Sequence, residues 1–172
     1  IVNFLLSTGI RQNSLINIKI KDLDFDNDMV YINTTKNRKS LIIPLNEDIV
    51  KILHEYLKYR GGGSEDWLFC SIYGEKMTKG ANYTALWDYS HSRGLDKTGV
   101  HRYRHTFAKK WVTMGGSIVT LQKILGHSSL AITEGYLNML TTDLKKDMNE
   151  INIIRSLKQE RMQIVRPVSY TH

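Results

Sequence analysis

Apolar residues recur along the chain with two different periods. In most segments they return every three or four positions, the period of an amphipathic helix, whereas two short segments are rich in β-branched residues, as strands are. Helices are predicted at residues 1–10, 14–20, 47–60, 82–92, 100–116, 117–125 and 142–161, and strands at residues 29–35 and 40–45. This order predicts an α+β fold that is mainly α-helical and contains a small antiparallel β-sheet or hairpin.

The two predicted strands are joined by a turn at residues 36–39. Pro44 closes the second strand, where its missing N–H costs no ladder hydrogen bond. Two neighbouring segments lack a clear period: DLDFDND (22–28) is predicted as a turn-rich loop and DWLFCSI (66–72) as a short extended piece.

Composition places the chain among soluble globular proteins. Its 172 residues are enough for one domain with a buried core, 41% of them are apolar, and no run of about 18 uncharged apolar residues could span a membrane. Lysine and arginine number 24 against 17 acidic residues, a net charge of +7 that favours a polyanionic partner. The chain begins without methionine in an apolar run, IVNFLLSTGI, so we interpret it as a fragment that lacks an N-terminal region.

Cysteine and histidine spacing limits the possible chemistry. Cys70 is the only cysteine, which excludes a disulfide framework and indicates a reducing compartment, and its apolar context WLFCSI predicts a core position. The metal-ligand spacings CxxC and HExxH do not occur in the sequence, so no metal site is predicted.

The segment VHRYRHTFAKKWVTMGG (100–116) has two distinct faces when drawn as a helix. Tyr103, Phe107 and Trp111 form an apolar stripe that is predicted to be core. Beside it lies a second face with His101, Arg104, His105 and Ala108. Two imidazoles and a guanidinium near a helix N-terminus are suited to binding an oxyanion such as a phosphate.

The next segment has the outline of a helix-turn-helix. Residues 117–125 are amphipathic, Gly126 is a plausible C-terminal stop, and Ser128 or Ser129 could cap a second helix. Taken alone, this outline fits a DNA-binding module without catalytic activity.

Several motifs occur together in a fixed order. They are TGIRQNSL, a lysine in the hairpin TTKNRKSLIIPL, HRYR followed by HTF, LGHSS, and a tyrosine nine residues after that histidine. Together they resemble the catalytic domain of the tyrosine recombinases, the phage integrase family of site-specific DNA strand-exchange enzymes. The resemblance covers residues 1 to about 140 and assigns six catalytic positions: Arg11, Lys36, His101, Arg104, His127 and Tyr136.

Phosphodiester chemistry independently calls for these residue types. The phosphate is an anion, so its cleavage without a metal ion requires fixed positive charge, which two guanidinium forks, Arg11 and Arg104, can supply with His127 as a third donor. Ionising Tyr136 at pH 7 costs roughly 4 kcal/mol because a phenol has a pKa near 10. A neighbouring cationic cluster lowers this cost.

The resemblance also implies how the reaction proceeds. Tyr136 forms a 3′-phosphotyrosine and frees a 5′-hydroxyl, with His101 as general base and Lys36 as general acid, and no cofactor is needed. Lys39 lies in the same turn, but counting back from Pro44 against the family pattern favours Lys36.

Further expectations follow for DNA contacts, partners and location. Arg38, Lys39 and His105 are expected to bind DNA. The partner is double-stranded DNA at a specific recombination site, bound by a homo-tetramer whose subunits are monomers in isolation. The expected location is the cytoplasm of a bacterium, with the protein encoded by the chromosome, a phage or another mobile element, and no membrane involved.

Residues 1–172 are interpreted as a single catalytic domain whose N-terminal DNA-binding region is absent. Within it, the predicted helix at 142–161 either docks on a neighbouring subunit or packs on its own domain.

Two positions depart from the family pattern. An acidic residue often lies three positions after the first arginine, where this chain has Ser14, and Tyr103 replaces a residue that is more often leucine. These departures concern the local geometry and leave every proposed catalytic group in place.

Two other functions remain to be distinguished from recombination. A DNA-binding module would not need Arg11, Lys36 and Tyr136 together. A type IB topoisomerase uses the same tyrosine chemistry to relax supercoils, but the LGHSS motif and the short spacing from His127 to Tyr136 favour the integrase branch.

Overall fold

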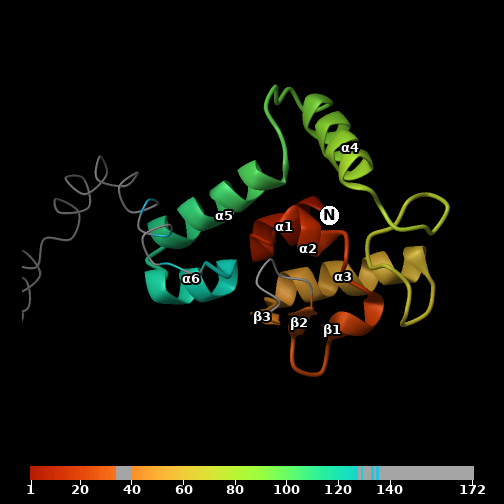
Figure 1. Ribbon diagram of the computed structural model, residues 1–172, viewed down its shortest axis with the longest axis horizontal. Coiled ribbons are helices and arrows are strands. Elements are labelled where there is room, and N and C mark those ends of the chain that lie inside the picture. Colours follow the sequence, from red (N-terminus) through yellow and green to blue (C-terminus); the bar gives the residue numbers. More distant parts are fainter. Residues whose placement is uncertain (34–39, 128, 130–132, 134, 136–172) are drawn as a thin grey trace, which may run out of the picture. The chain divides into compact units, whose positions relative to one another are not determined.

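The computed structural model describes residues 1–33, 40–127, 129, 133 and 135. All of them belong to the first of two units, Ile1–Tyr136 (Figure 1). The second unit, Leu137–His172, lies outside the described residues, and the predicted helix at 142–161 lies within it.

The N-terminal segment forms two short helices separated by a glycine. Helix α1 (Val2–Thr8) ends where Gly9 adopts a left-handed conformation with φ of 59°, and α2 (Gln12–Leu15) follows. The helix predicted at residues 1–10 is confirmed, but the one predicted at 14–20 is wrong beyond its first turn. The backbone there leaves the helical path because Ile18 O accepts from Leu68 N at 2.8 Å and Ile20 N donates to Asp66 O at 2.9 Å.

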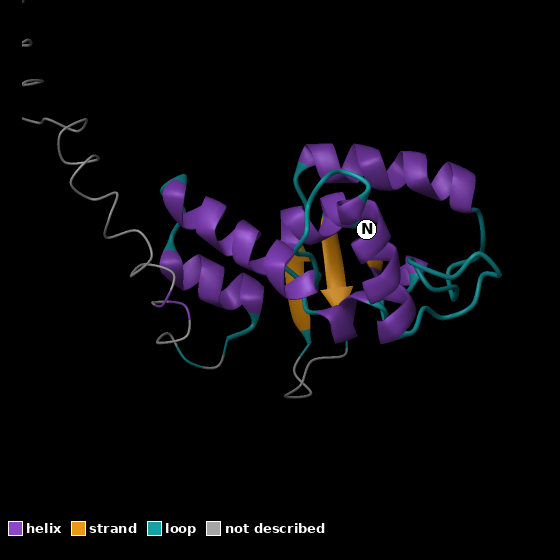
Figure 2. Ribbon diagram, turned by 90° about the horizontal axis from the view of Figure 1, so that it is seen from above, coloured by secondary structure: helices purple, strands orange, loops and turns teal. Residues whose placement is uncertain are grey.

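The predicted hairpin is part of a three-stranded antiparallel sheet (Figure 2). Its strands are β1 (Leu23–Asp24), β2 (Met29–Ile32) and β3 (Leu41–Pro44), in the order β1-β2-β3. Segment 22–28 is therefore not only a loop, since it begins with the end of a 3₁₀ turn, η1 (Ile20–Asp22), and contains β1. The turn at 34–39 lies outside the described residues.

Helices α3 (Glu47–Arg60) and α4 (Lys79–His91) both begin at a polar cap. The Asn46 side chain accepts from Ile49 N, and the Thr78 hydroxyl accepts from Ala81 N. Because Thr78 caps α4, this helix begins three residues before the predicted start at residue 82. Helix α3 has the predicted limits.

Helix α5 (Val100–Thr113) carries the motif HRYR followed by HTF, and α6 (Ile118–Leu125) leads into LGHSS. The turn between them is held by the Trp111 indole, whose Nε1 donates to Ser117 O at 3.0 Å. Helix α6 ends as predicted at Gly126, which is left-handed with φ of 60°.

Two clusters of buried apolar residues hold these elements together. Helix α1 contacts α3 and α5, and α6 contacts α5 and β3. The larger cluster contains Phe4, Leu5, Ile10, Leu15, Ile18, Val30, Ile32, Ile43, Leu45, Ile49, Leu53, Leu68, Phe69, Leu86 and Val100. The smaller cluster contains Phe107, Ala108, Leu121 and Leu125.

Some predicted core positions are less buried than expected. Of the aromatic stripe on α5, Phe107 is buried, whereas Tyr103 and Trp111 are half-buried against the two clusters. Cys70 is also only partly buried, because its neighbours Leu68 and Phe69 occupy the core positions of this extended segment.

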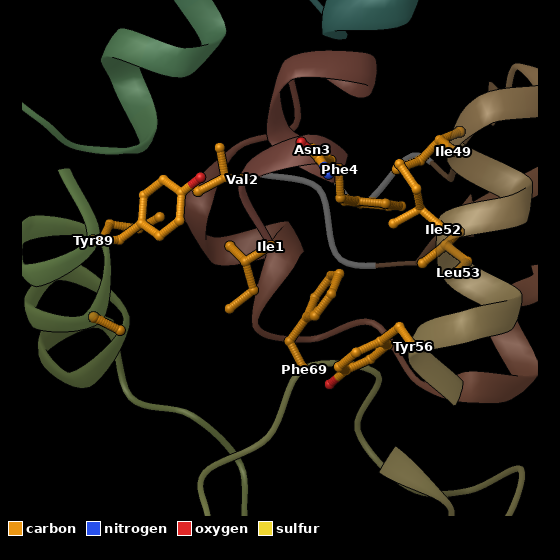
Figure 3. A pocket seen from close by; sticks show the side chains of 12 residues that line it. Ile1, Val2, Asn3, Phe4, Ile49, Ile52, Leu53, Tyr56, Phe69 and Tyr89 are labelled. Carbon is orange, nitrogen blue, oxygen red and sulfur yellow. The ribbon is translucent and has the colours of Figure 1, made fainter. Parts of the chain in front are cut away.

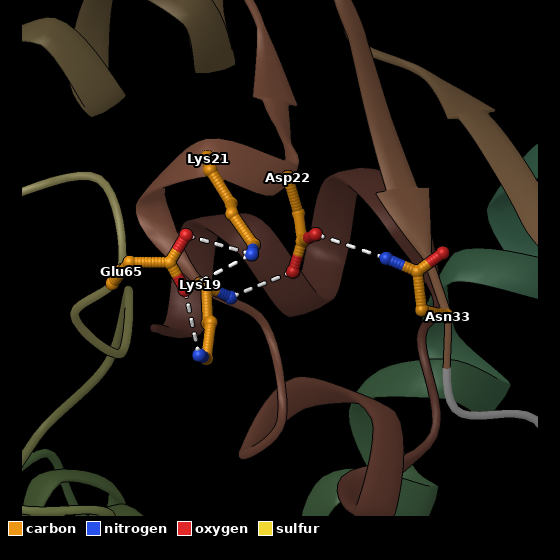
Figure 4. A network of polar contacts seen from close by, with 5 residues as sticks. All are labelled: Lys19, Lys21, Asp22, Asn33 and Glu65. Carbon is orange, nitrogen blue, oxygen red and sulfur yellow. Dashed lines mark hydrogen bonds and ion pairs between the residues drawn. The ribbon is translucent and has the colours of Figure 1, made fainter.

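A polar network fixes the base of the hairpin (Figure 4). Buried Asp22 accepts from Lys19 N at 2.8 Å and from Asn33 Nδ2 at 3.0 Å, and Asn33 is the last described residue before the turn. Glu65 accepts from the ammonium groups of Lys19 and Lys21. The network therefore ties the end of β2 to the 3₁₀ turn.

A helix that crosses a membrane must be both long and apolar. Within the described part of the chain, no helix is both long and apolar enough to cross a membrane.

We predict that Gly9→Ala destabilises the fold far more than Gly115→Ala. Both glycines have positive φ, which costs alanine about 1–2 kcal/mol. A Cβ at Gly9 would also overlap the Phe107 ring and lie 2.9 Å from Leu125 Cδ2, whereas one at Gly115 meets nothing within 4 Å. Overpacking adds about 1–3 kcal/mol, so urea denaturation should separate the two variants by this amount. Equal losses would show that the contact at Gly9 relaxes freely.

Candidate active site

Arg104 is a buried cation at the centre of the candidate site. Only 6% of the residue is exposed. Its Nη1 donates to Gly9 O at 2.7 Å, and its Nη2 donates to Leu125 O at 2.8 Å and to His127 Nε2 at 2.8 Å. A buried guanidinium must be hydrogen-bonded to be tolerated, so these bonds connect the ends of α1 and α6 to α5.

Arg11 approaches the same place from the N-terminal segment. It is the N-cap residue of α2 and is half-buried, and its Nη2 donates to Gly126 O at 3.2 Å. Ser14 leaves no carboxylate at the position where the family often has one, and the carbonyl of Gly126 provides support for the guanidinium instead. Arg104 thus binds the carbonyl of Leu125, the last residue of α6, and Arg11 binds the next carbonyl, that of Gly126.

His127 follows directly after Gly126 and completes the cluster. Arginine N–H groups can only donate, so Nε2 of His127 accepts from Arg104 and the ring proton resides on Nδ1. Nδ1 in turn donates to Thr133 Oγ1 at 2.9 Å. Burial of the imidazole, together with the charges of Arg104 and Arg11, lowers the pKa of His127 from 6.5 to about 4.

The backbone around His127 is held by Gln122 of α6. His127 N donates to Gln122 O at 3.1 Å, and Gln122 Nε2 donates to His127 O at 3.3 Å. This pair of bonds fixes the direction in which the chain leaves the helix, and with it the position of the imidazole.

The other predicted residues of α5 have different surroundings. His101 and His105 are exposed, although the helical wheel places them on one face with buried Arg104 and Ala108. Tyr103 donates to or accepts from Ser90 Oγ at 3.0 Å, a link between α5 and α4 that leucine could not make. This hydrogen bond is what the second departure from the family pattern adds to the structure.

Four predicted site residues lie outside the described residues: Lys36, Arg38, Lys39 and Tyr136. The structure therefore brings together Arg11, Arg104 and His127, and it places His101 one turn before Arg104 on the same helix. Gly135, next to Tyr136, has helical backbone and is exposed.

Two further features bear on what the site could bind. Among the described residues, no group of three or more histidine, cysteine or acidic side chains is arranged to hold a metal ion. A pocket of about 360 Å³ lies elsewhere, lined mainly by apolar and aromatic side chains of α1, α3 and α4 such as Phe4, Leu53 and Tyr89 (Figure 3). It contains none of the site residues, so it is not part of the cationic cluster.

Comparison with known proteins identifies the family. The pattern of the phage integrase family matches residues 1–163, and the chain belongs to this family. The tyrosine recombinase XerA of Saccharolobus solfataricus is 33% identical over 147 residues, which is 86% of this chain and 47% of that protein. The chain thus spans about half the length of the curated relatives it matches.

Solved structures confirm the predicted fold class. A crystal structure of XerA recombinase matches with a TM-score of 0.75 at 30% identity, covering 86% of this chain and 54% of that one. A structure of XerH recombinase bound to its difH substrate before cleavage matches with a TM-score of 0.69 at 27% identity, covering 85% of this chain and 44% of that one. The fold is that of a tyrosine recombinase catalytic domain.

Sequence analysis missed three residues that support the site. Gly9 supplies a carbonyl to Arg104, Gln122 holds the backbone of His127, and fully buried Thr133 binds its ring. Gly9 could have been suspected from its place in LSTGIR, before the first arginine. No spacing rule pointed to Gln122 or Thr133.

We predict that His127 makes the fold sensitive to mild acid. The unfolded chain binds a proton at His127 near pH 6.5, but the folded chain does so only near pH 4. Between these values the unfolded state holds more protons, so the contribution is intact above about pH 6.5 and is lost as the pH falls toward 4.

Urea denaturation of wild type and His127→Gln across this interval measures the effect. Glutamine cannot take up the proton, so the midpoint of the variant should fall less on acidification. The carboxylates titrate in both proteins and cancel in the comparison. Parallel curves for the two proteins would contradict the lowered pKa.

Proposed function

We propose that this chain is the catalytic domain of a site-specific DNA recombinase that cleaves and rejoins strands through a 3′-phosphotyrosine. The observation that supports this most directly is the convergence of Arg11, Arg104 and His127 from three separate segments. Two guanidiniums and an imidazole within one hydrogen-bonded cluster suit the negative charge that develops on a phosphorane. The relatives named as tyrosine recombinases agree with this proposal.

In the proposed reaction, the Tyr136 oxygen attacks the scissile phosphorus. A P–O bond forms to the tyrosine as the bond to the 5′-oxygen breaks, and the two arginines stabilise the charge on the non-bridging oxygens. His101 accepts the phenolic proton. This role is open to it because it is exposed and lies on α5, one turn before Arg104. Lys36 gives a proton to the departing 5′-oxygen.

The phosphate also changes the state proposed for His127. In the structure its Nε2 is occupied as an acceptor from Arg104. A phosphate oxygen that accepts from the Arg104 guanidinium would release Nε2. The freed nitrogen can then carry a proton and donate to the phosphate, as a third donor beside the two arginines.

The proposed partner is double-stranded DNA at a specific recombination site. Several solved relatives are bound to DNA, among them XerH with difH. The net charge of +7 suits such a partner, with Arg38, Lys39 and His105 as additional DNA contacts. We further propose a tetramer on DNA, in which the segment at 142–161 docks on a neighbouring subunit, and a DNA-associated role in the cytoplasm.

The central test uses Tyr136→Phe, which removes a single oxygen. The full-length protein is incubated with a nicked duplex that carries a site selected from a random-sequence library. Wild type should form a covalent protein–DNA adduct and strand-exchanged products, whereas Tyr136→Phe should bind the duplex equally well and form neither. An adduct that persists in the variant would exclude Tyr136 as the nucleophile.

A second reaction with a supercoiled plasmid that carries the same site separates the alternatives. Adducts with relaxation of supercoils but no strand exchange would indicate a topoisomerase, and binding without any adduct in wild type would indicate a DNA-binding module. Arg11→Ala should slow cleavage at least about a hundredfold, because it removes one of the two guanidiniums. The matched control is Lys109→Ala, which removes an exposed positive charge outside the cluster and should have little effect.

A second prediction distinguishes the two lysines of the hairpin turn. If Lys36 protonates the leaving 5′-oxygen, Lys36→Ala should cleave slowly, and a substrate with sulfur at the bridging position should recover much of the rate because a thiolate leaves without a proton. Rescue of Lys39→Ala in place of Lys36→Ala would transfer the role to Lys39. Rescue of neither would mean that the hairpin only binds DNA.

A further inference from the structure

The side chain of Thr133 is buried against the imidazole of His127. The residue has no exposed surface, and its Oγ1 lies 2.9 Å from His127 Nδ1. It is six residues from the histidine in sequence and follows the glycine turn at Gly126, so the contact is not a bond within one helical turn. Thr133 thus binds the side of the ring opposite to Arg104.

The two ring nitrogens have fixed and different partners. Nε2 faces a guanidinium that can only donate, so Nδ1 carries the proton and donates to the Thr133 hydroxyl. Because the imidazole is neutral at pH 7, with its pKa lowered to about 4, the position of its single proton determines what it can do. In the arrangement described, that proton points away from the cationic cluster.

A hydroxyl differs from other possible partners in one respect. It can accept from Nδ1–H, and after rotation about its C–O bond it can donate to a bare Nδ1. A carboxylate in this place could only accept and would hold the proton on Nδ1, and a methyl group could do neither.

We propose that Thr133 is a positioning residue that holds the His127 ring in place in both of its neutral tautomers. Before DNA binds, its hydroxyl accepts from Nδ1–H while Nε2 accepts from Arg104. When a phosphate engages Arg104, one proton leaves Nδ1 and one arrives at Nε2 by exchange with water. The ring gains no net charge, the hydroxyl reverses its role, and Nε2–H donates to the phosphate.

Only the part of this inference that concerns phosphate binding rests on the proposed recombinase function. The DNA-free tautomer and the hydrogen bond from its Nδ1–H to Thr133 do not require that any strand be cleaved. The DNA-free state of His127 and the effect of Thr133 on cleavage are therefore tested by different experiments.

Two substitutions separate the hydroxyl from the volume of the side chain. Thr133→Val keeps the shape and removes the hydroxyl, and Thr133→Ser keeps the hydroxyl and removes a methyl group. In full-length protein with ¹⁵N-labelled histidine, wild type and Thr133→Ser without DNA should show His127 protonated at Nδ1 and bare at Nε2. Thr133→Val should keep the proton on Nδ1, because Arg104 still faces Nε2, but its Nδ1 resonance should shift to that of an N–H group without an acceptor.

Single-turnover cleavage of the nicked duplex gives the functional readout. Loss of one hydrogen bond to the ring should slow Thr133→Val about tenfold without changing its affinity for the duplex, and Thr133→Ser should cleave nearly as fast as wild type.

The proposal is overturned if DNA-free wild type carries the proton on Nε2, or if the valine variant matches wild type in both measurements. It is also overturned if serine fails to restore the rate. Absence of an adduct in wild type, with the predicted tautomers intact, would overturn the recombinase function and leave the assignment of the DNA-free state standing.

Discussion

The burial of one guanidinium, that of Arg104, is the constraint on which the arrangement of the site depends. A charge in this position is tolerated only because Gly9 O, Leu125 O and His127 Nε2 all accept from it. These acceptors come from residues 95, 21 and 23 positions away in the sequence, so the bonds cannot form until the three segments are folded together. The cation that is proposed to bind phosphate is therefore also a structural link.

The same constraint explains two features of the acceptors of Arg104, the small size of Gly9 and the neutral charge of His127. Gly9 must present its carbonyl while the Phe107 ring and Leu125 occupy the space where a Cβ would lie. His127 must remain neutral to accept from Arg104, and burial next to two arginines keeps it so. The carbonyls of Gly9 and Leu125 hold Arg104 in the DNA-free protein, so the rearrangement proposed on phosphate binding is confined to the release of His127 Nε2 and the shift of the ring proton.

Local patterns in the sequence predicted the elements that depend on local interactions. Helix 47–60 has an amphipathic period and a glycine stop, and the hairpin has two β-branched runs, so both were found. The helix expected at 14–20 failed because Ile18 and Ile20 form backbone bonds to Leu68 and Asp66, some 50 residues away, which no local pattern encodes. For the site, motif order identified Arg11, Arg104 and His127, but Thr133 and the carbonyl of Gly9 matter through contacts in space alone.

The position of the scissile phosphate relative to Arg104 tests this account most directly. A crystal structure of the full-length protein with its selected DNA site and orthovanadate, which mimics the phosphorane, would locate that group. The account predicts vanadate oxygens within hydrogen-bonding distance of the Arg11 and Arg104 guanidiniums and of His127 Nε2, with the Tyr136 oxygen bonded to vanadium. A vanadate bound elsewhere, with Arg104 still bonded to the carbonyls and to His127, would contradict the claim that this buried cation is the phosphate site.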